Sequence, residues 1–588
     1  MYSHDYHTSL CSDSWLSVTA KAVFCPCTVR SLRRTLRSNL TPESGESPAR
    51  LPSIPHTGAT VSNHAAIFRQ VLETDPQWLE QIRRGVEKES LRVTADQATL
   101  AQTSHPEGLG STLTHPAITT DYSEALLEFI TPASHSIAET EQALADLHRF
   151  TARHLDQELL WNASMPCIVN GDAGIPIAEF GTSNVGQMKR IYRNGLSVRY
   201  GRKMQAIAGI HYNFSLPESF WAAAHDLAGT AHDAQAFQTE GYLALIRNFF
   251  SRVWMLMYLL GASPAVCASF IQGNKHHPLE PMGEDHHSFF LPYATTLRMG
   301  DLGYTSNAQA GMDVCYNDLD QYISTLRDAI LTPHPAYGQF DLMQNGERAQ
   351  LNTSLLQIEN EYYSPIRPKR VTQSGEAPVV ALARKGIEYV EVRCVDINPF
   401  TPFGIDADTM RLIDLFLIAC LIDDSPPCEA DGQRQNKTNL QRMVNRGREP
   451  GLTLLSRDGV ETPREELAEP ILDRMDEVAK WCDSGTGSTD YEQVVARARA
   501  HIADPALTLS ARVLDEMTTN NQSFWQLALR YSREWHQQHL EAPLSDATWE
   551  AMMDEAAISL ERQQEIESHD NQSFDTYLSQ FYEQYQSV

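Results

Sequence analysis

Four short stretches of this chain combine a strand-like alternation with acidic or imidazole side chains on one face. They span residues 85–93, 124–130, 210–217 and 386–396. Because successive side chains of an extended strand point to opposite faces, the polar residues of each stretch share a side and the apolar residues take the other. The polar set consists of Glu87 and Glu89; Glu128; His211, Asn213 and Ser215; and Glu391 and Arg393. We therefore expect strands of a large sheet that carry carboxylates on one face.

These acidic side chains are the first candidates for a functional site. A further acid, Asp121, lies in a turn just before the second stretch. Carboxylates on otherwise apolar strands destabilise a fold unless something pairs with them, and divalent cations would do so. Carboxylate oxygens with a single imidazole, His211, suit magnesium or manganese, whereas a zinc site would show more His or Cys. The sequence thus predicts a metal-assisted site on a sheet.

A simpler interpretation stays open for each stretch alone. Acids at alternate positions are also what the solvated face of a half-buried sheet shows, and a lone His211 is more often a packed core residue. Four such stretches in one chain favour the metal site.

The charge of the chain limits what it binds. The formal net charge is −28, which argues against nonspecific nucleic-acid binding, because that requires a basic surface. Phosphate-binding loops of the G-x-x-x-x-G-K-S/T and G-x-G-x-x-G types are missing, so any ATP is held differently. The basic residues Arg367, Lys369 and Arg370 follow the acidic, strand-like stretch 357–363, and they predict either phosphate contacts or a solvated basic turn.

The pattern along the chain predicts one folded unit. Residues 1–63 are rich in Ser, Thr, Arg and Pro without apolar periodicity, and we expect them outside the folded core. A disordered extension, an organelle transit peptide and a misassigned start codon all remain open for them. Residues 64–588 are expected to form a single catalytic domain, with long helices near 136–154 and 238–260 and mostly helical structure after about residue 406.

Location follows from the apolar and cysteine patterns. Residues 253–271 are long and apolar enough to raise the question of a membrane span, but Gly261 and Pro264 interrupt them. We expect a buried helix that ends at Gly261 and no membrane segment. Ten cysteines without a secretory signal favour a reducing compartment, so the expected location is the cytoplasm.

Several stretches closely resemble glutamate-cysteine ligase of the proteobacterial type 1. They read RRGVEKESLRV, ITTDYSEALLEFITP, FGTSNVGQMKRIYRNGL, AGIHYNFSLP, LPYATTLRMGDLGYT, LQIENEYYSPIRPKRV and GIEYVEVRCVDINPF. They occur in the family's order from about residue 64 onward, and the match is weakest over the last hundred residues.

The resemblance implies an α+β fold and a metal site. The fold would have a mixed, largely antiparallel sheet curved into a funnel, with helices packed outside, as in glutamine synthetase. Two or three magnesium ions, which manganese could replace, would be held by matching positions. These are Glu87, Glu89, Asp121, Glu128, His211 and Glu391.

The resemblance also implies the substrates, which are L-glutamate, L-cysteine and ATP. The cysteine pocket would consist of Tyr192, Leu196, Gln205, Arg298, Tyr304 and Tyr363, with Arg298 binding the carboxylate. The glutamate γ-carboxylate would attack ATP to give γ-glutamyl phosphate, and the cysteine amine would then displace phosphate. Arg393 would stabilise the charge of the transferring group. The product, γ-glutamylcysteine, is the precursor of glutathione, and the family favours a monomer.

Two alternatives remain. A related carboxylate-amine ligase would use the same metals with another amine acceptor, but the cysteine-pocket positions match the family. A catalytically silent homologue would have lost a metal carboxylate, and all of the matching carboxylates are present.

Overall fold

The computed structural model describes residues 64–588 except 274–276, 284–285, 303–308, 345 and 374. The predicted extension 1–63 and Tyr304 therefore lie outside the described residues.

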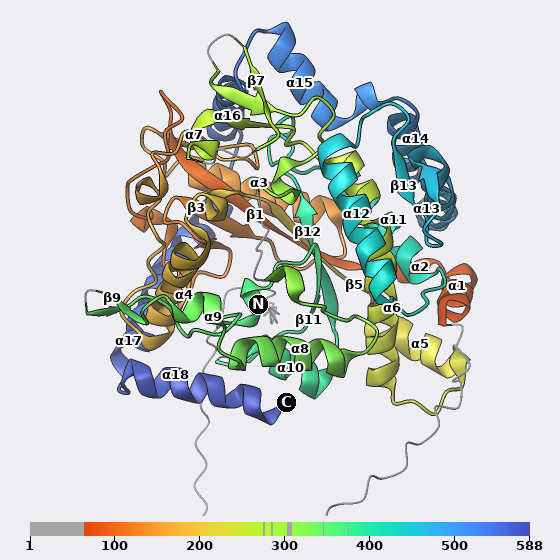
Figure 1. Ribbon diagram of the computed structural model, residues 1–588, viewed down its shortest axis with the longest axis horizontal. Helices are drawn as coiled ribbons and strands as arrows, with labels where there is room; N and C mark the ends of the chain where they lie inside the picture. The colour runs from red at the N-terminus through yellow and green to blue at the C-terminus, as the bar shows by residue number, and fades with distance from the viewer. Residues whose placement is uncertain (1–63, 274–276, 284–285, 303–308, 345, 374) are drawn as a thin grey trace, which may run out of the picture.

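A seven-stranded antiparallel sheet forms the centre of the fold (Figure 1). Its main path runs β11-β12-β5-β1-β3-β2, and β4 pairs with the far end of β1. The strands are β1 (Arg83–Thr94), β2 (Ile118–Thr120), β3 (Leu126–Ile130), β4 (Glu158–Leu160), β5 (Ile210–Ser215), β11 (Ile366–Lys369) and β12 (Tyr389–Val395). The four stretches predicted as strands are thus neighbours in one sheet, and the α+β class with antiparallel pairing is confirmed.

The strand register brings the predicted acidic residues opposite one another. Glu87 pairs with His211 across β1 and β5, and Glu89 pairs with Glu128 across β1 and β3. On the next strand, Glu391 pairs with Asn213. Since side chains at directly paired positions share a face, these residues form one polar surface on the sheet.

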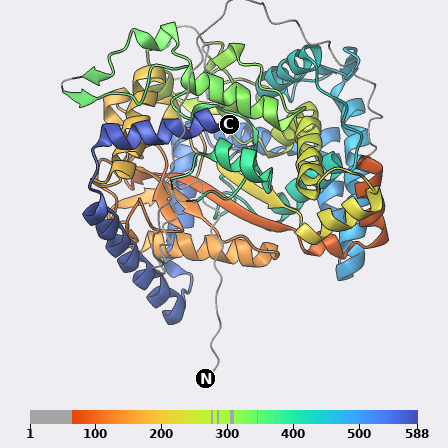
Figure 2. The ribbon, with the colours of Figure 1, turned by 90° about the horizontal axis from the view of Figure 1, so that it is seen from below.

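Helices surround this sheet (Figures 1 and 2). The long ones are α1 (His64–Thr74), α3 (Ile137–Ala152), α4 (Asn184–Tyr200), α5 (Glu218–Ala228), α6 (Ala234–Leu260), α8 (Leu319–Leu331), α10 (Pro378–Lys385), α11 (Ala407–Leu421), α12 (Ala430–Arg446), α13 (Arg464–Thr486), α14 (Asp490–Ala503), α15 (Leu509–Thr519), α16 (Phe524–Glu541), α17 (Asp546–His569) and α18 (Phe574–Glu583). The helices expected near 136–154 and 238–260 correspond to α3 and α6. Among the described residues, three smaller sheets are separate from the central one, with the orders β6-β8-β7, β10-β9 and β13-β14. Their strands are β6 (Ala265–Cys267), β7 (Glu280–Met282), β8 (Ser288–Phe290), β9 (Met343–Gln344), β10 (Glu347–Arg348), β13 (Thr453–Leu455) and β14 (Glu461–Pro463).

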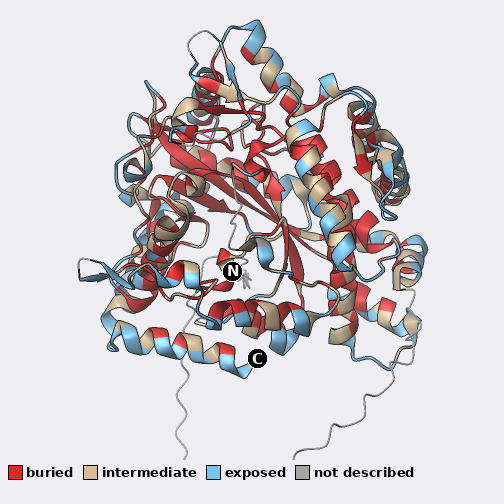
Figure 3. Ribbon diagram, in the orientation of Figure 1, coloured by how far each residue is buried: buried red, intermediate tan, exposed pale blue. Residues whose placement is uncertain are grey.

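Helices α3 and α11 cover the face of the sheet opposite the acids. Lys88 of β1 points to α3, where its Nζ lies 2.8 Å from His148 Nε2. On the same side, Arg84 forms an ion pair of 3.0 Å with Asp414 of α11, and Tyr212 donates to Asp414. Figure 3 shows the strands of the sheet coloured as buried along most of their length. Both faces of the sheet are therefore shielded from bulk water.

Helix α6 is the one helix in the described part of the chain that is long and apolar enough to cross a membrane. It is a core helix, since 72% of its most apolar window is buried inside the structure. It ends at Gly261, as predicted, where a Cβ atom would overlap the carbonyl oxygens of Met257 and Thr295. The close approach of these two backbones requires glycine.

The C-terminal helix lies along the lower edge of the molecule in Figure 1. Helix α18 packs on α4, and the short turn after it packs on α10. There the hydroxyl of Tyr585 donates to the carboxylate of Glu359, in the segment just before Tyr363. The chain end thus supports a wall of the cavity described below.

Candidate active site

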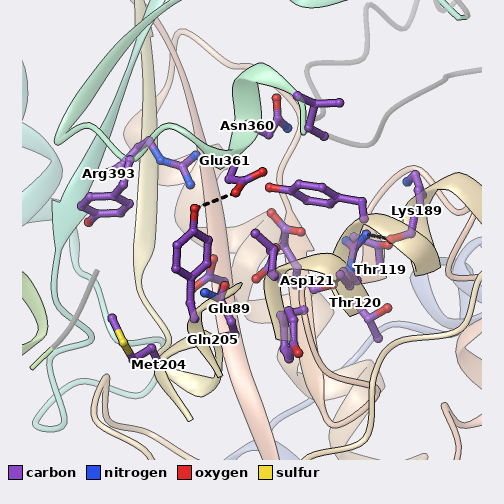
Figure 4. Close-up of a pocket in the computed structure, with 18 of the residues that line it drawn as sticks. Glu89, Thr119, Thr120, Asp121, Lys189, Met204, Gln205, Asn360, Glu361 and Arg393 are labelled. Atoms are coloured by element: carbon purple, nitrogen blue, oxygen red, sulfur yellow. Dashed lines mark hydrogen bonds between the residues drawn. The ribbon is translucent and has the colours of Figure 1, made fainter. Parts of the chain in front are cut away.

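A cavity of about 160 Å³ opens on the polar face of the sheet. Its walls come from β1, β2, β3, β5 and β12, from helix α4, and from the segment 358–363 (Figure 4). The predicted site residues that line it are Glu89, Asp121, Glu128, Tyr192, Leu196, Gln205, His211, Tyr363, Arg367 and Arg393. Residues from strands far apart in the sequence thus meet in one cavity.

Three of the predicted metal ligands, Glu87, His211 and Glu391, form a tight group, of which only His211 lines the cavity itself. One ligand atom each of Glu87, His211 and Glu391 lies within 4.8 Å of the others, and all three residues are buried. His211 Nδ1 is 3.2 Å from Glu87 Oε2 and 3.9 Å from Glu391 Oε1. On its other side, His211 Nε2 is 3.6 Å from Glu89 Oε1. The imidazole therefore stands among three carboxylates.

Burial and mutual repulsion raise the pKa values of most of these acids. Desolvation and then the charge of Asp121 raise the pKa of both Glu89 and Glu128 to about 8. Desolvation and then the charge of Glu391 raise the pKa of Glu87 well above its usual value. Without a cation, the protein can keep this group of carboxylates buried only by leaving some of them protonated.

The pKa values of Glu391 and His211 are both lowered, which favours the unprotonated forms that metal ligands need. Burial acts to raise the pKa of Glu391, but Lys369 and Arg393 outweigh it and hold that pKa below its usual value. Burial, and then Arg393, lower the pKa of His211 well below its usual value, so the imidazole is neutral and can donate an electron pair. Glu391 Oε1 is buried and accepts no hydrogen bond. This donor set of carboxylates and one neutral imidazole fits magnesium or manganese.

The basic residues differ in how close they come to this centre. Arg393 Nη1 lies 3.0 Å from Glu391 Oε2, and Lys369 Nζ lies 3.5 Å from Glu391 Oε1. Arg367 lines the cavity and donates to the backbone carbonyls of Asn360 and Tyr362. Arg370 does not line this cavity: it follows Lys369, the last residue of β11, and points to the opposite side. There its Nε donates to the carbonyl of Gly386.

Four residues of the predicted cysteine pocket line this cavity. Tyr192 and Leu196 lie one turn apart on α4, and Gln205 and Tyr363 line the same cavity. Arg298 is fully buried behind the wall, where Nη2 donates to the backbone carbonyl of Arg393 at 2.8 Å.

Sequence reasoning missed a polar network in the cavity wall. Glu361 accepts from Arg199 at 2.9 Å and from the Tyr200 hydroxyl at 2.7 Å. The stretch 357–363 was predicted as strand-like, and this was wrong: its centre, Glu359–Glu361, is a 3-10 turn. The carboxylate of Glu361 holds this turn, because it also accepts from the backbone N–H of Gln357 at 2.6 Å. The two acids in QIENEYY were the available signal, but their partners are distant in the sequence.

Comparison with known proteins agrees with this geometry. The family model for glutamate-cysteine ligase matches residues 69–443. The glutamate-cysteine ligase of Pseudomonas paraeruginosa is 48% identical over 507 residues, which cover 86% of this chain and 94% of that protein. The glutamate-cysteine ligase of Azotobacter vinelandii is 48% identical over 508 residues, with the same coverage.

A solved structure supports the same relationship. The crystal structure of glutamate-cysteine ligase from Francisella tularensis in complex with AMP aligns with a TM-score of 0.81 and 35% identity, covering 86% of this chain and 98% of that one. A bifunctional glutathione synthetase from Pasteurella multocida shares the fold, with a TM-score of 0.65 and 24% identity over 81% of this chain and 55% of that one. The chain belongs to the glutamate-cysteine ligase family.

Proposed function

We propose that this glutamate-cysteine ligase carries out the first step of glutathione biosynthesis in two chemical steps within the cavity. The γ-carboxylate of glutamate attacks the γ-phosphorus of ATP, which forms γ-glutamyl phosphate and releases ADP. The amine of cysteine then attacks the γ-carbonyl carbon and phosphate leaves. The observation that carries this proposal is the buried group of Glu87, His211 and Glu391 next to Arg393.

Divalent cations fit the acidic end of the cavity. We propose that Glu87, Glu89, Asp121, Glu128, His211 and Glu391 hold Mg²⁺ or Mn²⁺. Bound cations of this kind neutralise the phosphate charges of a nucleotide and the charge that develops during transfer. The raised pKa values of Glu89 and Glu128 support this assignment, because a cation would favour their charged forms. The buried oxygen Oε1 of Glu391, which accepts no hydrogen bond, would be available as a ligand.

The nucleotide is proposed to lie along β11 and β12. The relative from Francisella tularensis was solved with AMP bound. Here Arg367 and Lys369 are two positions apart on β11, so both side chains lie on the face that carries Glu391. Both suit phosphate oxygens. Arg393 is placed to stabilise the charge of the transferring phosphoryl group. Arg370, which points away, is expected to contribute least.

The amine acceptor is proposed to bind between α4 and Tyr363. Tyr192, Leu196 and Gln205 supply an apolar and aromatic wall with one amide, which suits a small side chain such as that of cysteine. We keep Arg298 as the proposed partner of the cysteine carboxylate. Its bond to the Arg393 carbonyl also fixes the strand that carries Arg393. Tyr304, the remaining member of the proposed pocket, lies outside the described residues.

Four wider properties are part of the proposal. Residues 64–588 act as one catalytic domain, whose central sheet curves around the cavity as a funnel. The protein works as a monomer in the cytoplasm. The resemblance to the family supports the funnel and the monomer, and the cysteine content supports the location.

The test is ADP release by the purified protein with glutamate and Mg²⁺ and one amine acceptor at a time. Cysteine should give the highest kcat/KM, with serine, alanine and glycine well below it, and each ADP should be matched by one γ-glutamylcysteine. Turnover that prefers another amine would indicate a related carboxylate-amine ligase. No turnover with any acceptor would indicate a silent homologue.

A further inference from the structure

Lys189 is a buried cation in the cavity wall for which the proposed chemistry has given no role so far. It lies on α4, is 6% exposed and lines the cavity. In the part of the chain that the structure describes, its Nζ forms no hydrogen bond or ion pair. This atom lies over the ring of Phe180, 4.9 Å from its centroid. An ammonium without a counter-charge is costly to bury, so an anion at this place would stabilise it.

The other cationic residues that line the cavity are already bonded within the protein. Arg393 pairs with Glu391. Arg367 donates to two backbone carbonyls, and Arg193 donates to the carbonyls of Asp121 and Lys189. Lys189 therefore has more capacity for a ligand than any of these three side chains.

Lys189 lies away from the group expected at the phosphate end. Figure 4 shows Lys189 and Arg393 on opposite sides of the cavity, with Asp121 and Glu89 between them. A nucleotide phosphate at Arg393 would therefore leave Lys189 to a different anion. Glu128 and Asp121 act on Lys189 through their charges but lie beyond ion-pair distance, and burial lowers its pKa to about 7. A negatively charged ligand would favour the charged ammonium.

We propose that the Lys189 ammonium binds the α-carboxylate of an amino-acid substrate. This inference deepens the proposed function and rests on it. Both glutamate and cysteine carry an α-carboxylate that takes no part in bond making, and the many acids of the cavity would repel it. A single ammonium offers the point charge and the three donors that such a group needs. Because Arg298 is already the proposed partner of the cysteine carboxylate, the α-carboxylate of glutamate is the expected ligand, and the experiment distinguishes it from that of cysteine.

The test compares Lys189→Met and Lys189→Arg with the wild-type protein and with Lys437→Met, which changes an exposed lysine of α12. The KM values for glutamate, cysteine and ATP are measured separately. Each amino acid is then replaced by its analogue without the α-carboxylate, 4-aminobutyrate for glutamate and cysteamine for cysteine. Lys189→Met should raise the KM of one amino acid about 10-fold or more, as expected for loss of a charged hydrogen bond. It should leave the KM of ATP within about 2-fold, because Lys189 makes no contact with the nucleotide in the proposed arrangement.

The analogues identify the substrate. If Lys189 binds the carboxylate of glutamate, kcat/KM for 4-aminobutyrate will be low and equal in the wild type and in Lys189→Met. If it binds the carboxylate of cysteine, kcat/KM for cysteamine will be low and equal in these two proteins. Lys189→Arg, which keeps the charge, should recover part of the lost affinity.

Two results would overturn the inference. Unchanged KM values for both amino acids would mean that Lys189 only offsets Glu128 and Asp121. A rise confined to the KM of ATP would mean that it binds phosphate. If Lys189→Met does not fold, Lys189→Gln replaces it. Equal KM values for each amino acid in the Gln and Arg variants would then show that the charge at this position does not bind a substrate carboxylate. Absence of cysteine-dependent turnover in the wild type would instead defeat the proposed function itself.

Discussion

His211 Nδ1 lies 3.2 Å from Glu87 Oε2, across paired positions of β1 and β5. The two residues are 124 positions apart in the sequence, and Asn213, two residues further along β5, donates to the other oxygen of Glu87 at 2.7 Å. Glu87 is thus held from both sides while its charge is opposed by Glu391 and Glu128. In the proposed site, a cation bound here would be stabilised by this arrangement, which destabilises the metal-free protein.

Replacing Glu87 by Gln separates its proposed role in cation binding from its effect on the stability of the metal-free protein. Glu87→Gln keeps the shape of the side chain and an oxygen for Asn213, but it removes one charge from the acidic group. We expect kcat to fall about 100-fold or more, because a preorganised charge in the site is lost. Without Mg²⁺, the melting temperature should equal or exceed that of the wild type. Near-normal turnover would show that Glu87 is not a ligand. Glu534→Gln, on an exposed part of α16, is the control.

Gly209 is required because Arg298 passes close to it. A Cβ atom at this position would overlap the Arg298 guanidinium, and the backbone N–H of Gly209 donates to Glu89 Oε2 at 2.6 Å. Gly209→Ala should displace Arg298 and lower kcat/KM about 10-fold or more, since small misplacements in a site are costly. The kinetic constants and the melting temperature provide the check. An alanine variant with wild-type kcat/KM would show that Arg298 and its neighbours tolerate displacement.

The ion pair between Arg84 and Asp414 joins the sheet to α11 and is 2% exposed on both sides. Arg84→Met should destabilise the protein by about 3–5 kcal/mol, because it leaves Asp414 buried without its partner. The double variant Arg84→Met with Asp414→Leu should recover a large part of this loss. Chemical denaturation of the three proteins measures both quantities. Equal stability of the two variants would mean that the buried charge of Asp414 is not the source of the loss.

Stability should fall in acid because of buried histidines. Burial, and then Arg92, lower the pKa of His105 to about 3, and burial, and then Arg562, lower the pKa of His115 to about 4. Both stay neutral in the folded protein from pH 6.5 down to these pKa values, a range in which the unfolded chain binds protons. Each therefore contributes stability that is present above pH 6.5 and is lost as the pH falls through its folded pKa, by up to about 1.4 kcal/mol per pH unit.

The variant His105→Gln checks this reasoning. Neither ring nitrogen of His105 has a hydrogen-bond partner among the described residues, so the change removes a titrating group without breaking a bond. The melting temperature should decline less steeply between pH 6.5 and 4 in this variant than in the wild type. An identical slope would show that His105 is protonated in the folded state.

The strands that carry the acids were predictable because alternation is a local signal. Glu87 and Glu89 share a face whatever strand lies beside them, and the same holds for Glu391 and Arg393. The order of the strands was not predictable, since the pairing of Glu87 with His211 depends on chain segments far apart. The missed turn at Glu359–Glu361 has the same cause: Arg199, which holds Glu361, is 162 residues away. Local pattern identifies the polar face, whereas the long-range partners determine which residues complete the cavity.

Lys189 shows a second limit of sequence reasoning. A lysine on a helix is usually exposed, and nothing in its neighbours indicates that α4 turns it into the cavity. Only the packing of α4 against the strands shows that its ammonium is buried.

The central claim is that the acids from these separate strands bind divalent cations together. Binding of Mn²⁺ to the wild-type protein, measured by electron paramagnetic resonance with a non-hydrolysable ATP analogue present, tests it most directly. We predict bound Mn²⁺ that Mg²⁺ displaces, and weaker or less binding in Glu391→Gln, which keeps the fold. Mn²⁺ that stays free in the wild type, or binds Glu391→Gln equally well, would contradict the account.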